Sequence, residues 1–286
     1  MSAVTPTPVA LDSRRTKALG QLRTAALAAA LACASSGAHA ALASVVINGL
    51  SVSGVSDPSF FLFAPTDTRN QSWILEAETN GVPNQTNAGS VPSWAILDRA
   101  AQTPNGAAKA EVHSAIDTDN STGLETPRFT LTAAANSPGA IGVLYTALGN
   151  MLTSGSFCFW DSNTNYDGTS ASCTGSGSLT FTLFYDLIVQ SAFALPNSAY
   201  AEVDVLGTGV PGGLFFDFAS TVASIPSKFD KSFTWTADLT AGNAAFFDIN
   251  GVVVAEAIPE PGILSLAALG LIGLAATRRR KVGAVS

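Results

Sequence analysis

The chain has 286 residues and a formal net charge of −7, and 47% of its residues are hydrophobic while only 12% are charged. Six of the 14 Lys and Arg residues and 19 of the 21 Asp and Glu residues fall within residues 41–258, so that span alone has a net charge of −13. Such a span repels nucleic acid and anionic lipid, which excludes both as its partners. It is long enough to bury one sizeable core.

The first 40 residues have the organisation of a secretory signal peptide. Positive residues come first, an Ala- and Leu-rich core follows at 24–34, and Ala38-His39-Ala40 offers an A-x-A cleavage site. We expect cleavage after Ala40, with Ala38 and Ala40 as the small residues that signal peptidase requires. The mature chain then begins at Ala41.

Residues 41–258 are predicted to form one all-β domain, an antiparallel β-sandwich of jelly-roll-like or immunoglobulin-like type. Apolar and polar residues alternate along 178–189 and 199–205, and Phe229, Phe233 and Trp235 are expected to share one face of a further strand. Weaker patterns predict strands at 45–52, 72–78, 91–97, 109–116 and 128–133.

Turns and loops are less certain from pattern alone. Asn250-Gly251 predicts a two-residue hairpin turn between apolar runs, and Asn48-Gly49 is a second candidate. Residues 100–106 resemble a long loop. Apolar residues between 141 and 152 fall at helical spacing, so a short helix there is an alternative to a strand.

Cys158 and Cys173 are the two cysteines that remain after signal cleavage, and export exposes them to an oxidising space. We therefore expect a disulfide between them. The loop that it closes contains oxygen-bearing side chains at alternate positions, namely Asp161, Asn163, Asn165 and Asp167. Calcium requires ligands of this kind, but Tyr166 and Ser172 stand where an EF-hand needs Gly and Glu, so a metal-free polar turn is the favoured interpretation. No other cofactor is expected.

Catalytic constellations are few in the mature span. His113 is its sole histidine, and no G-x-S-x-G elbow accompanies it. Two pairs of carboxylates would each share one face of a strand: Glu76 with Glu78, and Glu202 with Asp204. Each pair could serve as the two carboxylates of a glycosidase, or could consist of ordinary solvated residues. The four tryptophans (Trp73, Trp94, Trp160 and Trp235) could form a sugar-stacking platform or belong to the core.

The end of the chain has three consecutive parts. Pro259-Glu260-Pro261 breaks regular structure, residues 262–277 are apolar on all sides, and Arg278, Arg279, Arg280 and Lys281 follow. A helix over 262–277 would be roughly 24 Å long, slightly less than the hydrocarbon core of a bilayer. Its flanking cations and lack of a polar face predict a single membrane-spanning helix rather than a buried core helix.

These three parts resemble the PEP-CTERM sorting signal of Gram-negative bacteria. The resemblance covers residues 259–281, with Pro259, Glu260, Pro261 and Arg278–Arg280 as the matching positions. It implies an exosortase-type processing enzyme as partner and an inner-membrane-anchored precursor that is later released to the cell surface or medium. It implies nothing about the activity of residues 41–258.

Two functions from different classes remain. The first is a structural or adhesive surface protein, without catalysis, that associates with exopolysaccharide in a biofilm matrix. The alternative is a secreted carbohydrate-binding module or glycan-active hydrolase. The lack of a recognisable catalytic constellation favours the first.

Overall fold

The computed structural model describes residues 41–118, 122–136, 143–191 and 197–257. The expected signal peptide, with Ala38 and Ala40, and the tail from 258 onwards, with the helix expected at 262–277, lie outside the described residues. Within the described ranges, no helix is both long enough and apolar enough to cross a bilayer.

Strands make up most of the described chain. They are β1 (Ala41–Ser56), β2 (Phe60–Phe63), β3 (Asn70–Thr79), β4 (Val82–Val91), β5 (Leu97–Gln102), β6 (Ala108–Thr118), β7 (Glu125–Ala135), β8 (Tyr145–Asp161), β9 (Gly177–Ser191), β10 (Ser198–Gly207), β11 (Leu214–Ser220), β12 (Lys228–Leu239) and β13 (Ala245–Ala257). Three short 3₁₀ turns accompany them: η1 (Thr66–Thr68), η2 (Ser170–Ser172) and η3 (Pro211–Gly213). The all-β prediction is confirmed.

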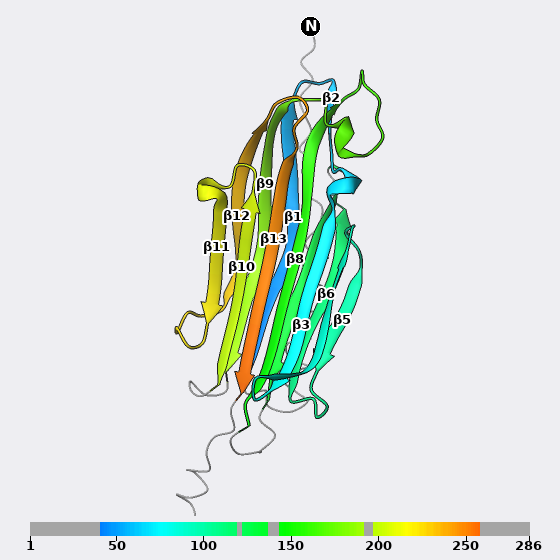
Figure 1. Ribbon diagram of the computed structural model, residues 1–286. Coiled ribbons are helices and arrows are strands. Elements are labelled where there is room, and N and C mark those ends of the chain that lie inside the picture. Colours follow the sequence, from blue (N-terminus) through cyan, green and yellow to red (C-terminus); the bar gives the residue numbers. More distant parts are fainter. Residues whose placement is uncertain (1–40, 119–121, 137–142, 192–196, 258–286) are drawn as a thin grey trace, which may run out of the picture. The chain divides into compact units, whose positions relative to one another are not determined.

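The strands form two antiparallel sheets (Figure 1). The first sheet has the order β12-β9-β1-β7-β6-β5, and the second has the order β11-β10-β13-β8-β3-β4. β2 adds to the far end of β8 outside this path. β13 and β8, at the centre of the second sheet, pair over thirteen residues each.

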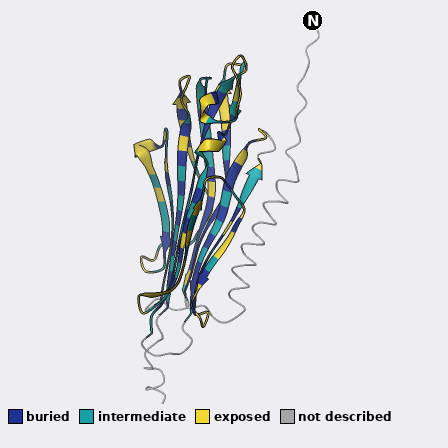
Figure 2. Cartoon of the chain, turned by 45° about the vertical axis from the view of Figure 1, so that its right-hand side comes forward, coloured by how far each residue is buried: buried dark blue, intermediate teal, exposed yellow. Residues whose placement is uncertain are grey.

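Each sheet turns one face to a shared core, as the alternating sequence pattern predicts. Along β13, every second residue from Ala245 to Ala257 is buried, while the residues between them are partly or fully exposed (Figure 2). β10 alternates in the same way over the predicted stretch 199–205, and β9 does so from residue 178 to residue 185, after which its residues are buried on both faces as far as 189. Large rings fill the centre, where Phe157 stacks on Phe247 and makes an edge contact with Phe181.

The two Asn-Gly pairs do not form hairpin turns, so both turn predictions are wrong. β13 runs straight through Asn250-Gly251, which face Leu152 and Met151 of β8. A Cβ on Gly251 would lie 2.9 Å from the Phe129 ring of the other sheet, so glycine is needed there for close packing of the sheets. Asn48-Gly49 lies inside β1, where the register with β9 shifts at a β-bulge.

Three other sequence predictions need correction. Residues 91–97 are mainly the connection from β4 to β5, and the indole of Trp94 fills the core edge from there, with its Nε1 donating to the Ser154 carbonyl at 2.8 Å. The stretch interpreted as a loop at 100–106 begins with β5, which continues to Gln102. Phe229 is exposed rather than aligned with Phe233 and Trp235, because a register shift separates Lys228 from Lys231.

The alternative helix at 141–152 is also wrong for its described part, since β8 begins at Tyr145. Leu144, Leu148 and Leu152 are four residues apart, and that spacing puts side chains on one face in a strand as well as in a helix. Pairing with β3 on one side and β13 on the other decides in favour of the strand.

The ends of the described chain and the Cys173 loop lie at opposite ends of the sandwich. β13 ends at Ala257 beside Tyr145, the first residue of β8, whereas β8 ends at Asp161 beside β2. Ala41 starts β1 near the Ala257 end, because Val45 of β1 packs beside the Gly251 position of β13. The first and last described residues therefore lie at one end, and the loop that contains Cys173 lies at the other.

Candidate functional site

The disulfide fixes the loop that follows β8. Cys158, near the end of β8, bonds to Cys173 across a sequence separation of 15, with Cα atoms 5.5 Å apart. This is the pairing that cysteine number and export predict. The loop then returns to the strand, where the Gly175 N–H donates to the Phe159 carbonyl at 2.8 Å.

Hydrogen bonds join this loop to the segment between β2 and β3. The carboxylate of Asp67 in η1 accepts from the N–H and hydroxyl of Ser170 in η2, at 2.8 and 2.6 Å. The N–H of Thr66 donates to the Gly168 carbonyl at 3.0 Å. Two loops that are far apart in sequence therefore hold each other at this end of the sandwich.

The four candidate calcium ligands lie in this loop, but their known contacts are local. Asp161 Oδ1 accepts from the N–H and side-chain amide of Asn163, at 2.9 and 2.8 Å. Asp167 Oδ1 accepts from the N–H and hydroxyl of Thr169 and from the hydroxyl of Ser172. These bonds, first that from the Thr169 hydroxyl, lower the pKa of Asp167 to about 2.

Such contacts are typical of Asx-type turns, which need no ion. Asn165 is exposed between the two turns. Among the residues that the structure describes, no group of three or more His, Cys, Asp and Glu side chains is arranged to hold a metal. The metal-free polar turn stays the favoured prediction for this loop, with calcium binding by Asp161, Asn163, Asn165 and Asp167 as its untested alternative.

Three aromatic side chains gather on the outside of this end, and we call them the aromatic cluster: Phe61, Trp160 and Tyr166. The Trp160 ring lies 5.8 Å from that of Phe61 and 5.0 Å from that of Tyr166. Phe61 and Tyr166 are 54% and 55% exposed, so the cluster offers ring surface to solvent. The indole Nε1 of Trp160 donates to the Thr164 carbonyl at 3.2 Å, which holds the ring in place.

The core buries three of the four tryptophans, namely Trp73, Trp94 and Trp235. The fourth, Trp160, has exposed aromatic neighbours. No sequence pattern connects Trp160 with Phe61, because the predicted strands do not include β2 or its pairing with β8. The run Phe60-Phe61-Leu62-Phe63 was the available signal, since it follows Asp57-Pro58-Ser59 and alternates across a short strand.

The predicted carboxylate pairs lie elsewhere. Glu76 and Glu78 share the outer face of β3, and Glu202 and Asp204 share the outer face of β10. Burial and, to a lesser extent, the neighbouring Asp204 raise the pKa of Glu202 to about 7. The two carboxyl groups of β10 are hydrogen-bonded to each other, whereas a glycosidase pair needs a separation of about 5 to 10 Å.

His113 occupies the exposed strand position that the sequence indicated. Its Nδ1 lies 3.3 Å from a carboxylate oxygen of Asp98, and both side chains are largely in solvent. The neighbouring Ser114 points into the sandwich, where its hydroxyl donates to the Ala95 carbonyl at 2.7 Å. Histidine and serine are therefore on opposite faces of β6 and cannot act together.

Comparison with known proteins adds information on the tail only. Residues 257–281 match the family model of the PEP-CTERM protein-sorting motif. The chain carries a PEP-CTERM sorting signal. The signal implies an exported protein that an exosortase processes at the membrane. No curated protein and no solved structure gives a significant match.

Proposed function

We propose that this PEP-CTERM protein is a non-catalytic adhesive component of the cell surface or extracellular matrix, and that its aromatic cluster binds glycan. The observation that supports this proposal is the contact of Trp160 with two half-exposed rings, Phe61 and Tyr166. Aromatic faces bind the apolar C–H faces of sugar rings, while hydroxyl groups need nearby polar partners. Asp161, Asn163 and Thr164 supply such partners on the adjoining turn.

The cluster is pre-organised for binding. The disulfide, the Asp67–Ser170 contacts and the Trp160 hydrogen bond restrict the loop before any ligand arrives. A site that is already ordered loses less conformational entropy on association. The acidity of residues 41–258 favours a neutral glycan, or an acidic exopolysaccharide bridged by calcium, because direct contact between two anions is repulsive.

The location of the cluster is consistent with an adhesive function. The sorting motif begins at residue 257, where β13 ends beside the start of β8, and the cluster lies at the other end of β8. The seventeen residues from Tyr145 to Asp161 span roughly 54 Å in extended conformation. A chain held through its tail therefore presents the cluster to material outside the cell.

A glycan hydrolase is the second candidate, since Glu202 has a pKa near that of a general acid. The closeness of Glu202 and Asp204, whose interaction contributes to the raised pKa of Glu202, argues against it, because a glycosidase pair needs a separation of about 5 to 10 Å. The pair also lies on the outer face of the second sheet, away from the aromatic cluster.

The binding test uses the exported, processed protein and the exopolysaccharide of its own cells, with calcium and then with a chelator. We expect Trp160→Ala and Tyr166→Ala to weaken binding by about five-fold or more, the loss expected for one stacked ring. Phe229→Ala is the matched control, because Phe229 is an equally exposed ring, 53% exposed, on β12 of the first sheet. Unchanged binding by both cluster variants would overturn the glycan site, and release of reducing sugar that Glu202→Gln abolishes would establish the hydrolase.

Sorting is tested by deleting residues 262–286. The deletion removes the apolar segment and the cations that an exosortase substrate requires, so we expect uncontrolled release to the periplasm or medium. Localisation and processing like those of the intact chain would exclude the membrane-anchored precursor.

A further inference from the structure

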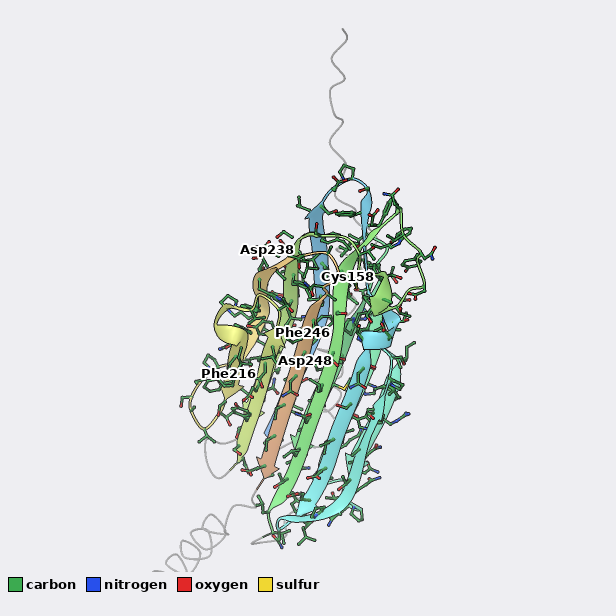
Figure 3. All side chains as sticks on the ribbon, turned by 45° about the horizontal axis from the view of Figure 1, so that its top comes forward. Cys158, Phe216, Asp238, Phe246 and Asp248 are labelled. Atoms are coloured by element: carbon green, nitrogen blue, oxygen red, sulfur yellow. A yellow bond between two sulfur atoms is a disulfide. The ribbon has the colours of Figure 1, made fainter. Side chains whose placement is uncertain are left out.

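A second exposed apolar surface lies on the outer face of the second sheet, towards its β11 edge. We call it the apolar face, and its members are Leu206, Leu214, Phe216, Phe218 and Phe246. Figure 3 labels Phe216 and Phe246 on this face, with Asp248 beside them. Leu206, Leu214, Phe216 and Phe246 are between 43% and 54% exposed.

The register of the strands makes these side chains neighbours. Leu206 of β10 pairs with Leu214 of β11 on one side and with Asp248 of β13 on the other. Phe216 lies 5.3 Å from Phe218 between ring centroids, on the same strand. The other half of the same outer face, on β3 and β4, bears mainly Ser, Thr and Glu. The apolar residues are thus concentrated at the β11 edge, where an edge strand is a ready site of association.

Acidic groups lie at the centre of the apolar face. Glu202 accepts a hydrogen bond from Tyr200 and bonds to Asp204, whose carboxylate accepts from Asn250 at 3.4 Å. The groups that surround Glu202 are Tyr200 and Asp204 on its own strand, Phe218 of β11, Val252 and Asn250 of β13 and, further along β13, Asp248 and Glu256. Lys228, on β12, is ion-paired to Asp217 and lies 5.9 Å from the Phe218 ring.

We propose that the apolar face is a self-association surface through which two copies of this chain pack under mildly acidic conditions. An acid pair without a cation is self-complementary, because a protonated carboxyl group donates to the ionised group of the other copy. At higher pH the same groups, on two copies that each carry excess negative charge, repel one another.

The size of the face agrees with a reversible dimer. The width of the face is roughly 19 Å, because it covers four strands, from β11 to β8, that lie about 4.8 Å apart. Its length is roughly 27 Å, because it covers eight residues of β13 at about 3.4 Å each. The area is therefore on the order of 500 Å² per copy. Two such faces together reach the lower limit of about 1,000 Å² for a specific interface. A contact of this size is sensitive to a few charges.

Burial of Glu202 sets the pH range of the proposed switch. Its pKa is raised to about 7, first by burial and then by Asp204, and burial also raises the pKa of Asp248. Both carboxyl groups therefore take up protons at higher pH than exposed ones do. The charge that opposes association is removed as the pH falls below neutrality.

The test is analytical ultracentrifugation of the exported, processed protein at pH 5.5 and pH 8. We expect dimers whose dissociation constant is about ten-fold lower at pH 5.5 than at pH 8. This is the change expected if one carboxyl group binds a proton on dimerisation and its pKa rises by about one unit in the dimer. Phe216→Ser and, as a second variant, Leu214→Ser should abolish the dimer, and Glu202→Gln should permit it at pH 8. Ile74→Ser is the matched control, because Ile74 is 46% exposed on β3 of the same sheet.

Three results would overturn this proposal. They are a monomer at both pH values, a dimer equally strong at pH 5.5 and pH 8, and a dimer that Ile74→Ser disrupts as much as Phe216→Ser does. A monomer that binds exopolysaccharide through Phe216 would replace the second copy with a glycan as the occupant of this face.

Discussion

Phe215 of β11 stacks on Phe233 of β12 with ring centroids 3.9 Å apart and ring planes 11° apart. β11 and β12 are edge strands of different sheets, so this pair closes one side of the sandwich. The stack continues through Trp235 to Phe181, which connects the side of the domain to its centre.

Removing one ring from this stack should destabilise the domain. We expect Phe233→Ala to lower the free energy of unfolding by about 3 kcal/mol, through lost burial and lost stacking. Phe229→Ala on the same strand is the control, because Phe229 is 53% exposed and should change stability by less than about 0.5 kcal/mol. Urea denaturation of both variants measures the difference. Equal losses would mean that the Phe215–Phe233 pair does not join the sheets.

The connection between β10 and β11 depends on Gly209. A Cβ at this position would lie 1.8 Å from the carbonyl oxygen of Thr236 in β12, and its φ is +82°. Gly242 has a similar φ of +86° but open space around it. In thermal unfolding, Gly242→Ala should therefore lower the free energy of unfolding through backbone strain alone, by about 1 kcal/mol. Gly209→Ala should lower it clearly more, because the backbone must also move to make room for the Cβ. A smaller loss for Gly209→Ala would contradict the close contact.

Glu202 should make stability depend on pH. Its folded-state pKa of about 7 lies above the unfolded value of 4.5, so folding increases its affinity for a proton. The contribution of this carboxyl is therefore fully present below pH 4.5 and is lost as the pH rises to about 7. We expect Glu202→Gln to be more stable than the native chain at pH 8, by about 1 kcal/mol once solvent screening is considered. Denaturation at several pH values, at concentrations too low for association, checks this, and parallel curves for both proteins would refute it.

The disulfide should stabilise the end of the sandwich that carries the aromatic cluster. Replacing both Cys158 and Cys173 by Ser should cost about 3 kcal/mol, the chain-entropy value for a loop of about 15 residues. Intact-mass measurement after alkylation without reduction provides the direct check on the bond itself. Two alkylated thiols in the exported protein would disprove it.

Sequence reasoning succeeded where the relevant signal is local. Alternation along 178–189 predicted β9 because a period of two places Leu179, Phe181 and Leu183 together on the core side. The cysteine pairing followed from counting. Asn250-Gly251 misled because the reason for its glycine is the Phe129 ring of the opposite sheet, which no nearby residue reveals.

The order of strands and both exposed surfaces depend on contacts between distant segments. Phe61 meets Trp160 only because β2 pairs with the end of β8, and Leu214 meets Leu206 only because β11 pairs with β10. Glu202 and Asp204 were recognised as a pair from their spacing. Their partial burial, which raises the pKa of Glu202, depends on neighbours contributed by other strands.

The central position of β8 and β13 has a mechanical consequence. A pulling force between the aromatic cluster and the cell would act on the Asp161 end of β8 and on the Ala257 end of β13, which are adjacent antiparallel strands. Such a force slides the strands past each other along their length, so their thirteen register pairs share the load instead of separating one after another. Under the proposed adhesive function, tension between a bound glycan and the tail would load this strand pair in shear, the direction in which it resists best.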